Sequence, residues 1–334
     1  MKKPVIGIVG GSGYIGSRIA DRLGKRYTIR VLDRSPYPRD TVDGSVEYQP
    51  CDITHYEEVK RGLEGVSAVV HTAIVQIPLI NDQKELGYNV NFIGTQNVCK
   101  AVSENPSIKG VVLAGTWHVL GEKRLEGIID EDFGFRPDKV EDRAYLYALS
   151  KIAQEIIMRF YNQMVPRSIF GIIRLGTVLG EGMPEKTAAN IFISKGLKGE
   201  PITPYKHTMY RPMLYVDIYD VCRAFETYVE KILRGEISKN DKGTCDIVNL
   251  CWPIPITILD LAKFVQEEMV KLTEGRIRPE VEIVDQKLPM LHDPEDAKRL
   301  RIDIGKVEEF LGLKDLRNPR ESIGNIIRGR LEKT

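Results

Sequence analysis

Short apolar runs alternate with longer segments of helical periodicity through the first half of the chain. Most of the short runs are apolar at every position, which is typical of strands buried on both faces of a sheet. The longer segments place apolar residues three or four positions apart, as amphipathic helices do. The predicted strands are 5–9, 28–32, 45–49, 68–71, 111–114 and 169–174, and the predicted helices are 14–23, 56–63, 85–102 and 143–163. This alternation predicts an α/β fold with a doubly wound parallel sheet.

The regular alternation ends after Gly176, where glycine and proline begin to interrupt the chain. Further helices are expected at 217–232, 257–272, 306–311 and 320–331, with one more strand at 245–250. The pattern predicts a first domain over 1–176, which the segment 212–250 rejoins. A smaller α/β domain would consist of 177–211 and 251–334.

Composition narrows the class of protein. The 334 residues are 42% hydrophobic, enough for two cores, and 48 basic against 47 acidic residues leave no global field for nucleic acid or an anionic membrane. The five cysteines are odd in number and contain no C-x-x-C, which argues against a disulfide framework or a zinc site. The N-terminal apolar run is too short for a signal peptide, and the longest uncharged stretch, 66–81, is too short for a membrane span. We therefore expect a soluble cytoplasmic protein.

A glycine cluster follows the first predicted strand directly. In the run Gly10-Gly11-Ser12-Gly13-Tyr14-Ile15-Gly16, Gly10 permits a tight turn and Gly13 lets the backbone N–H groups around Tyr14 and Ile15 approach a pyrophosphate. Gly16 lets the following helix lie close to the strand, and the N-terminus of that helix favours negative charge. A strand before the glycines and a helix after them predict a dinucleotide site.

An acidic residue ends the second predicted strand, about 20 residues beyond the glycines. The Asp33 carboxylate could accept hydrogen bonds from both hydroxyls of an adenosine ribose and would repel a 2′-phosphate, which favours NAD over NADP. The adjacent Arg34 could stack on adenine or bind a phosphate, and an exposed turn is the alternative for both residues. Asp52, with Ile53, follows the third strand within reach of adenine, although Asp52 could equally cap the helix at 56–63.

Tyr147 and Lys151 are four residues apart in a predicted helix and therefore lie on one face. An ammonium close to a phenol lowers the pKa of the phenol, so Tyr147 is a candidate general base or acid. Tyr145 lies off the face of Lys151. On its own, this spacing is more typical of a solvated helix face than of a catalytic pair.

The order of these motifs resembles that of the extended short-chain dehydrogenase/reductase family, of the NAD-dependent epimerase/dehydratase type. Further stretches similar to that family are His71-Thr72-Ala73, Asn91 to Asn97, Gly115 to Gly121, Arg211 to Asp217, Asp303 to Lys306 and Leu311-Gly312. The resemblance implies a Rossmann domain that binds NAD and a smaller C-terminal α/β domain that binds substrate. It also implies a homodimer formed through 85–102 and 143–163.

The resemblance further implies roles for individual residues. Thr116 stands at the family's Ser/Thr position and would hold the substrate oxygen for proton transfer, with Trp117 and His118 beside the substrate. Lys151 would also bind the nicotinamide ribose, and His71 and Ala73 would border the cofactor. Asn91 would steady the local backbone of the site.

The reaction is less closely determined. Dehydratases of the family carry an Asp-Glu pair where this chain has Trp117 and His118, which disfavours elimination. The run from Thr116 to Val119 resembles the Ser-Asn-His-Val of uronate dehydrogenases. The C-terminal region is instead similar to that of nucleotide-sugar enzymes, with Asn190 near the nucleotide and Arg211 on the diphosphate, although the second arginine of that pattern is absent.

Three alternatives remain open on the sequence. The favoured one is a nucleotide-sugar epimerase that retains NAD. The second is an NAD-consuming dehydrogenase of a sugar, uronate, polyol or other secondary alcohol, and the third is a nucleotide sensor without activity. No metal site is expected, because His118 and His207 have no carboxylate or cysteine at ligand spacing.

Overall fold

The computed structural model describes residues 3–37, 46–239 and 247–333. Two predicted strands begin outside the described residues: the strand 45–49 at residue 45, and the strand 245–250 at residues 245 and 246. Within the described part, the order of helices and strands is the predicted alternation through the first half of the chain. The predicted α/β fold is confirmed.

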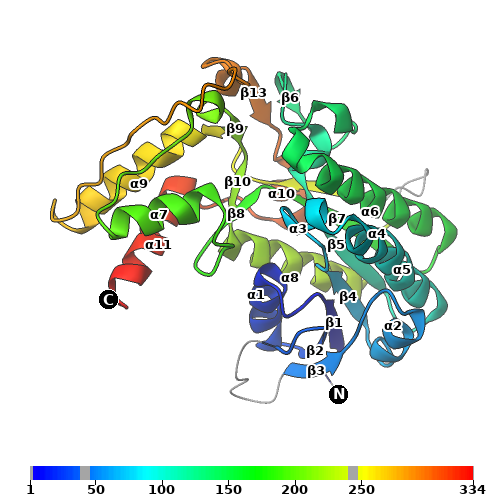
Figure 1. The fold of residues 1–334 in the computed structure, drawn as a ribbon. Helices are drawn as coiled ribbons and strands as arrows, with labels where there is room; N and C mark the ends of the chain where they lie inside the picture. The colour runs from blue at the N-terminus through cyan, green and yellow to red at the C-terminus, as the bar shows by residue number, and fades with distance from the viewer. Residues whose placement is uncertain (1–2, 38–45, 240–246, 334) are drawn as a thin grey trace. The chain divides into compact units, whose positions relative to one another are not determined.

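A seven-stranded sheet forms the centre of the first half, in the order β11-β7-β5-β4-β1-β2-β3 (Figure 1). Its strands are β1 (Val5–Val9), β2 (Thr28–Asp33), β3 (Val46–Pro50), β4 (Ala68–His71), β5 (Gly110–Thr116), β7 (Ile169–Leu175) and β11 (Ile247–Leu250). β1 pairs in parallel with both β2 and β4, so the chain reverses its direction of winding beside β1. In such sheets, ligands bind beyond the carboxyl ends of the strands near this reversal.

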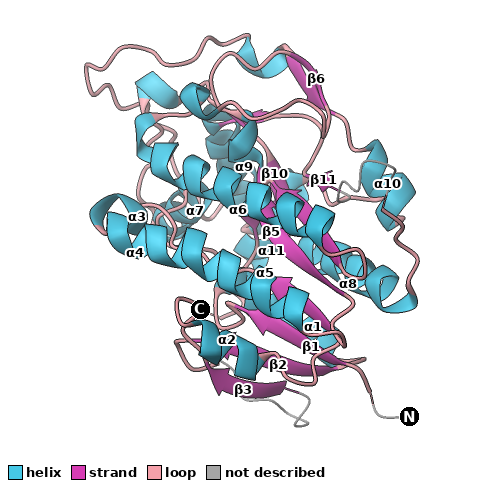
Figure 2. Cartoon of the chain, turned by 90° about the vertical axis from the view of Figure 1, so that its right-hand side faces the viewer, coloured by secondary structure: helices cyan, strands magenta, loops and turns pink. Residues whose placement is uncertain are grey.

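Helices cover both faces of the sheet. Packed against one another on one face are α2 (Tyr56–Gly62), α5 (Thr95–Glu104) and α6 (Tyr145–Met164) (Figure 2). The other face carries α1 (Tyr14–Gly24) and α8 (Ile218–Arg234), which lie side by side (Figure 1). Because both faces are covered, strands such as β4 and β5 are buried at every position, as their continuous apolar runs predict.

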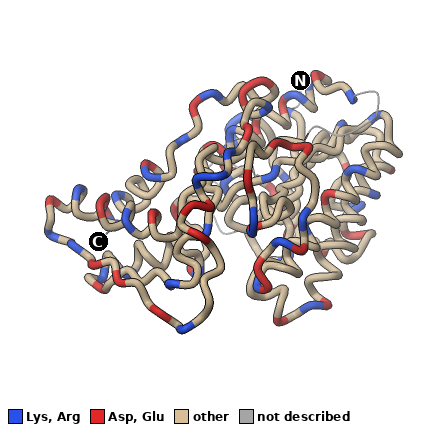
Figure 3. Tube along the Cα trace, turned by 90° about the horizontal axis from the view of Figure 1, so that it is seen from above, with Lys and Arg blue, Asp and Glu red and all other residues tan. Residues whose placement is uncertain are grey.

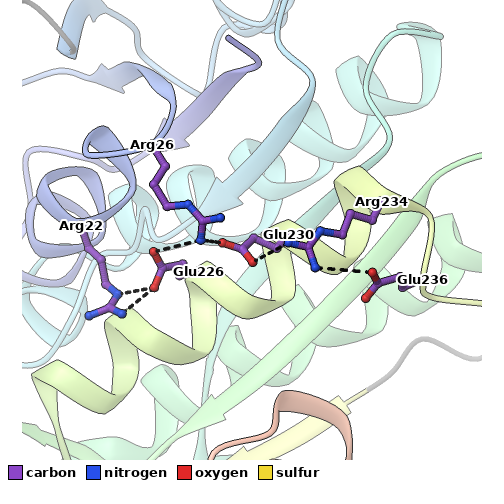
Figure 4. Close-up of polar contacts among 6 residues, drawn as sticks. All are labelled: Arg22, Arg26, Glu226, Glu230, Arg234 and Glu236. Carbon is purple, nitrogen blue, oxygen red and sulfur yellow. Dashed lines mark hydrogen bonds and ion pairs between the residues drawn. The ribbon is translucent and has the colours of Figure 1, made fainter.

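A chain of alternating charges joins α1 to α8 (Figure 4). Arg22 binds Glu226 at 2.5 Å, Arg26 pairs with both Glu226 and Glu230, and Arg234 lies 3.4 Å from Glu230. Linked pairs share partners, so ordering one side chain serves two contacts, whereas isolated surface pairs contribute little. The chain of charges therefore holds the two helices together on that face of the sheet.

The predicted helix 85–102 is wrong in detail. The structure has α4 (Lys84–Tyr88), then a π-helical turn η1 (Asn89–Gly94), and then α5. Within η1 the side chain of Asn91 accepts a hydrogen bond from the Val75 backbone N–H at 2.7 Å and donates to the Val75 carbonyl at 3.1 Å. A π turn carries one extra residue, and such turns are frequent at functional sites.

The described chain divides into two compact units. The first comprises 1–120, 134–174 and 222–248, and the second comprises 121–133, 175–221 and 249–334. This division differs from the expected one at two places, and strand pairing gives the reason. β6 (Gly127–Ile129) pairs with β13 (Leu300–Ile302), and β10 (Tyr215–Asp217) pairs with β8 (Thr177–Leu179), which draws 121–133 and 212–221 into the second unit.

The second unit is built from short strands and a helical layer. Besides β6, β8, β10 and β13 it contains β9 (Pro212–Met213) paired with β12 (Ile256–Thr257). The helices α7 (Ala188–Leu197), α9 (Ile258–Leu272) and α11 (Pro319–Leu331) pack together. The remaining α-helices of the described residues are α3 (Leu79–Asp82), in the first unit, and α10 (Gly305–Leu311), in the second. Of these, α3, α7 and the short strands were not predicted. The strands have only two or three residues each, which is too few for their periodicity to be detected.

Neither sign of charge dominates along the chain, which has 48 basic and 47 acidic residues. Basic and acidic positions interleave along the trace of both units (Figure 3). None of the described helices is both long and apolar enough to cross a membrane. The four described cysteines, Cys51, Cys99, Cys222 and Cys251, are buried with free thiols.

Candidate active site

The glycine loop after β1 has the close-packed geometry that a dinucleotide requires. Gly10 has φ of 79°, and a Cβ at this position would lie 2.4 Å from the backbone nitrogen of Ala73. A Cβ at Gly16 would lie 2.4 Å from the carbonyl oxygen of Gly10. Gly13 caps α1 without any side-chain hydrogen bond to the first turn, which begins at Tyr14 and Ile15. The loop therefore presents backbone N–H groups and the positive end of α1, which fits a pyrophosphate.

Asp33, at the carboxyl end of β2, lies against this loop. Its two carboxylate oxygens accept hydrogen bonds from the backbone N–H groups of Ser12 and Ser35, each at 3.0 Å. A carboxylate has about four acceptor sites, so two remain for the hydroxyls of a ribose. The position fits the adenosine end of NAD.

The neighbouring candidates for the adenosine end are partly engaged with one another. Arg34 lies 3.6 Å from the Asp52 carboxylate, and the other oxygen of Asp52 accepts from the backbone N–H and the hydroxyl of Thr54. Burial acts to raise the pKa of Asp52, but the bonds from Thr54 and the charge of Arg34 outweigh it and lower that pKa. Ile53 is buried in the hydrophobic core, so its side chain packs inside the domain. The helix cap predicted for Asp52 is instead His55, and Asp52 closes the turn before it.

Thr116, Tyr147 and Lys151 come together at the carboxyl end of β5. Thr116 is the last residue of β5 and is buried, while Tyr147 and Lys151 occupy successive turns of α6, which packs on β5. A hydrogen bond joins the side chains of Thr116 and Tyr147. This places a hydroxyl, a phenol and an amine at one edge of the sheet, the arrangement that proton transfer to or from a substrate oxygen needs.

The electrostatics of this group differ from the expectation based on spacing. Burial raises the pKa of Tyr147 to about 12, and only the hydrogen bond from Thr116 acts to lower it. Burial also lowers the pKa of Lys151 to about 7. The expected lowering of the Tyr147 pKa by Lys151 is absent for a geometric reason. The Lys151 Nζ donates to the Ala114 carbonyl at 2.7 Å and does not stabilise a phenolate in this arrangement.

His118 adds a fourth member to the group. Its Nδ1 lies 3.0 Å from Thr116 Oγ1, and its ring meets that of Tyr147 edge-on, with centroids 5.6 Å apart and planes at 88°. The ring of Trp117, which is buried, lies 4.6 Å from that of His118. The sequence marks His118 only as a substrate contact, and the structure places it on Thr116.

A buried polar network lies under α6. Asn91 donates to the Ser150 hydroxyl at 3.0 Å, and that hydroxyl donates to the Tyr147 carbonyl at 2.9 Å. Asn91 thereby ties the loop after β4 to the turn of α6 that carries Tyr147. Ser150 was missed on the sequence, since a serine in a helix carries no signal of its own.

His71, at the end of β4, belongs to the same network. Its Nε2 lies 3.0 Å from Thr95 Oγ1, which also accepts from Gln154 at 2.8 Å and donates to the Asn91 carbonyl at 2.8 Å. With the single hydroxyl hydrogen used, His71 must donate from Nε2. Burial lowers the pKa of His71 to about 3, so it is a neutral part of the framework. Gln154 and Thr95 were also missed.

The two remaining candidates, Asn190 and Arg211, belong to the second unit. The side chain of Asn190 donates to the Met183 carbonyl at 2.9 Å and accepts from the Ser194 hydroxyl at 3.2 Å. The first of these bonds ties α7 to the loop before it. Arg211 is half-buried, next to β9. No group of three or more metal-ligating side chains occurs among the described residues.

Residues 6–240 match the model of the NAD dependent epimerase/dehydratase family, which covers more than half of the chain. The chain belongs to this family. The glycine loop and Asp33 of this structure fit the NAD on which the family depends, and the family resemblance inferred from the motifs is confirmed.

Proteins of different specificity are similar to this member of the family. An NAD-dependent glucose-6-phosphate dehydrogenase of Haloferax volcanii is 27% identical over 195 residues, which are 56% of this chain and 72% of the relative. Among solved structures, a UDP-N-acetylglucosamine 4-epimerase from Methanobrevibacter ruminantium M1, in complex with UDP-N-acetylmuramic acid, has a TM-score of 0.78 at 18% identity and covers 100% of both chains. MoeE5 in complex with UDP-glucuronic acid and NAD has a TM-score of 0.77 at 20% identity, over 99% of this chain and 100% of its own. At these identities the structural likeness shows the fold.

Proposed function

We propose that this protein is a nucleotide-sugar epimerase that uses tightly held NAD. The observation that carries the proposal is the group of Thr116, Tyr147 and Lys151 at the carboxyl end of β5, on the sheet edge where Gly10 and Asp33 also emerge. Hydride chemistry on a sugar hydroxyl needs a base for the hydroxyl proton and a donor for the oxygen, and this group supplies both.

Each residue has a separate part in the reaction. Bound NAD supplies the hydride acceptor. Tyr147 accepts the proton of the sugar hydroxyl as the carbon is oxidised, and it returns the proton to the oxygen when the carbon is reduced from the other side. Thr116 holds that oxygen by a hydrogen bond, and Lys151 binds the nicotinamide ribose once its ammonium leaves the Ala114 carbonyl.

The likeness over whole chains supports a nucleotide sugar as substrate. Two nucleotide-sugar-bound structures align with 99–100% of this chain, including its second unit. The second unit also contains Arg211, and a guanidinium binds a diphosphate bidentately. We also propose the cytoplasm as the compartment, because the described cysteines have free thiols, as is usual in a reducing environment.

The deciding experiment combines cofactor content with product analysis. Purified protein should carry NAD, and incubation with UDP-glucose, UDP-glucuronic acid or UDP-N-acetylglucosamine should yield an epimer, detected by NMR, without a lasting rise in absorbance at 340 nm. Formation of stoichiometric NADH with oxidation of the sugar would contradict the proposal.

A dehydrogenase that releases NADH is the second candidate. It is supported by the likeness to the glucose-6-phosphate dehydrogenase of Haloferax volcanii, which is 27% identical over 195 residues. Glucose 6-phosphate and free uronic acids therefore belong in the same panel of substrates. A rise in absorbance at 340 nm with one of them alone would establish this alternative.

Replacing Asp33 by Ala should reduce the preference for NAD over NADP. The lost charged hydrogen bonds correspond to about 1–3 kcal/mol of NAD binding, whereas NADP gains by the removal of a repelling carboxylate. Calorimetric titration of the wild type and the variant with both cofactors measures the change. Tighter binding of NADP than of NAD by the unaltered protein would rule out this role of Asp33.

We also propose a homodimer formed through α4, α5 and α6. Three large apolar side chains, Ile156, Phe160 and Met164, follow one another at four-residue intervals along α6 and are 40%, 64% and 65% exposed. Tyr88, at the end of α4, is 55% exposed. A stripe of this kind on paired helices suits an interface that is repeated by a twofold axis.

Replacing Phe160 by Glu should convert the dimer to a monomer, because a carboxylate would be buried without a partner at the interface. Light scattering at micromolar concentration gives the mass. Ile128→Glu, at an apolar position of β6 that is 74% exposed, is the matched control and should leave the mass unchanged. A monomeric wild type would contradict the proposal.

A further inference from the structure

We propose that His118 is a positioning residue, whose Nδ1–H donates to Thr116 Oγ1 and so directs the hydroxyl hydrogen of Thr116 to the phenol oxygen of Tyr147. The inference deepens the proposed function and rests on it, because it concerns the base of that reaction. It assigns His118 to the proton-transfer group and not to the substrate pocket.

The geometry places the three side chains in a line of hydrogen bonds. Thr116 Oγ1 lies between the Tyr147 side chain, to which it is hydrogen-bonded, and the His118 Nδ1 at 3.0 Å. The backbone N–H of His118 also points to Thr116 Oγ1, at 3.4 Å. The edge-on contact with Tyr147 and the contact with Trp117 fix the plane of the imidazole ring. These two ring contacts restrict the rotation of the imidazole and keep its Nδ1 on the hydroxyl.

The number of available hydrogens determines which group donates in each of the two hydrogen bonds when Tyr147 acts as a base. A phenolate oxygen can only accept, so Thr116 must donate its single hydrogen to it. Thr116 can then take part in the second bond only as an acceptor, and His118 must donate from Nδ1. A hydroxyl that accepts one hydrogen bond becomes a stronger donor in the next one. His118 therefore favours the ionised form of Tyr147 without touching it by a hydrogen bond.

Among the described residues, the other titratable groups near Tyr147 do not form hydrogen bonds to its phenol. On α6, the Lys151 ammonium is directed to the Ala114 carbonyl, and on β4 the His71 ring is neutral and bonded to Thr95. The hydrogen bond from Thr116 is the influence that opposes burial at Tyr147. A residue that strengthens the Thr116 donor acts on the one contact that lowers the pKa of the phenol.

The test compares variants that keep or lose the Nδ1 donor. His118→Asn retains an amide N–H near the position of Nδ1, whereas His118→Phe keeps a flat ring against Trp117 without a donor. Tyr147 is titrated in the NAD-loaded protein by its absorbance at 295 nm, after subtraction of the same titration of Tyr147→Phe. The pKa of Tyr147 should rise by about one unit in His118→Phe, the equivalent of one hydrogen bond, and should stay near the wild-type value in His118→Asn.

Activity gives a second readout. The kcat/KM of His118→Phe at neutral pH should fall about 10-fold, because the phenolate fraction falls by that factor for one pKa unit. The rise of kcat/KM with increasing pH should move to higher pH by the same amount. If His118→Phe does not fold, His118→Gln, whose amide reaches the Nε2 position, should show the same loss.

Equal titration of Tyr147 in the wild type and the donor-free variants would overturn the inference, as would an equal rise in His118→Asn and His118→Phe. The titration needs no substrate, so it separates the two proposals. A protein that fails to epimerise nucleotide sugars but shows the shift would refute the proposed function alone.

Discussion

Replacing Tyr147 by Phe is expected to lower turnover by at least the ~100-fold typical of a lost general acid or base. The substitution removes one oxygen and keeps the ring, so its contact with His118 and the packing of α6 on β5 should remain. The affinity for NAD should change little, because the glycine loop and Asp33 are untouched. Steady-state kinetics of the variant and titration with NAD measure the two quantities separately.

Thr116 provides the matched control for this prediction. Thr116→Ser keeps the hydroxyl at the end of β5 and should retain most of the activity, whereas Thr116→Val keeps the shape and should lose most of it. If Tyr147→Phe retained nearly full activity with the true substrate, the proton would have to be taken by another group, such as His118 or a bound water.

The pKa of Tyr147 explains why the cofactor matters for proton transfer as well as for the hydride. Burial holds this pKa at about 12, so the phenol is protonated at neutral pH in the geometry described here. A positive charge close by lowers the pKa of a phenol. Lys151 would supply such a charge only if its Nζ left the Ala114 carbonyl, as the proposed hydrogen bond to the nicotinamide ribose would require. We therefore expect the binding of NAD and the activation of Tyr147 to be coupled through Lys151.

Sequence periodicity sufficed for the elements whose signal is local. β1, β4 and the glycine loop between β1 and α1 were predicted, because an uninterrupted apolar run followed by Gly10, Gly13 and Gly16 has few other structural solutions. The π-helical turn that contains Asn91 was not predicted; the Asn91 side chain within it bonds to the backbone of Val75, 16 residues away in sequence. A pattern of apolar residues gives no signal for such a long-range hydrogen bond.

The candidate site shows the same division. The spacing of Tyr147 and Lys151 placed them on one helix face, as the structure has them. Their ionisation depends on burial and on the direction of the Lys151 Nζ, which no spacing specifies. His118 was assigned to a pocket by its neighbourhood in sequence, and only the 3.0 Å contact reveals its place on Thr116.

Replacing Glu155 by Gln is expected to lower the free energy of unfolding of the first unit by about 3–5 kcal/mol, the cost of leaving a buried charge without its partner. Glu155, on α6, binds Arg174, on β7, through both carboxylate oxygens, at 2.7 and 3.1 Å. The side chains are 1% and 0% exposed. Arg159 and Phe135 complete the surroundings of the pair, since Arg159 also binds Glu155 and both guanidinium groups face the Phe135 ring. Urea denaturation followed by circular dichroism measures the loss.

Two further variants separate the buried charge from the rest of the cluster. Arg159→Gln removes a partner whose side chain is 40% exposed and should cost no more than about 1 kcal/mol. The double variant Glu155→Leu with Arg174→Met removes both charges and should regain much of the stability, because a buried pair replaced by apolar side chains of similar volume is often neutral. A loss of stability in Glu155→Gln no larger than that in Arg159→Gln would contradict the prediction. It would mean that water reaches the Arg174 guanidinium when Glu155 is neutral.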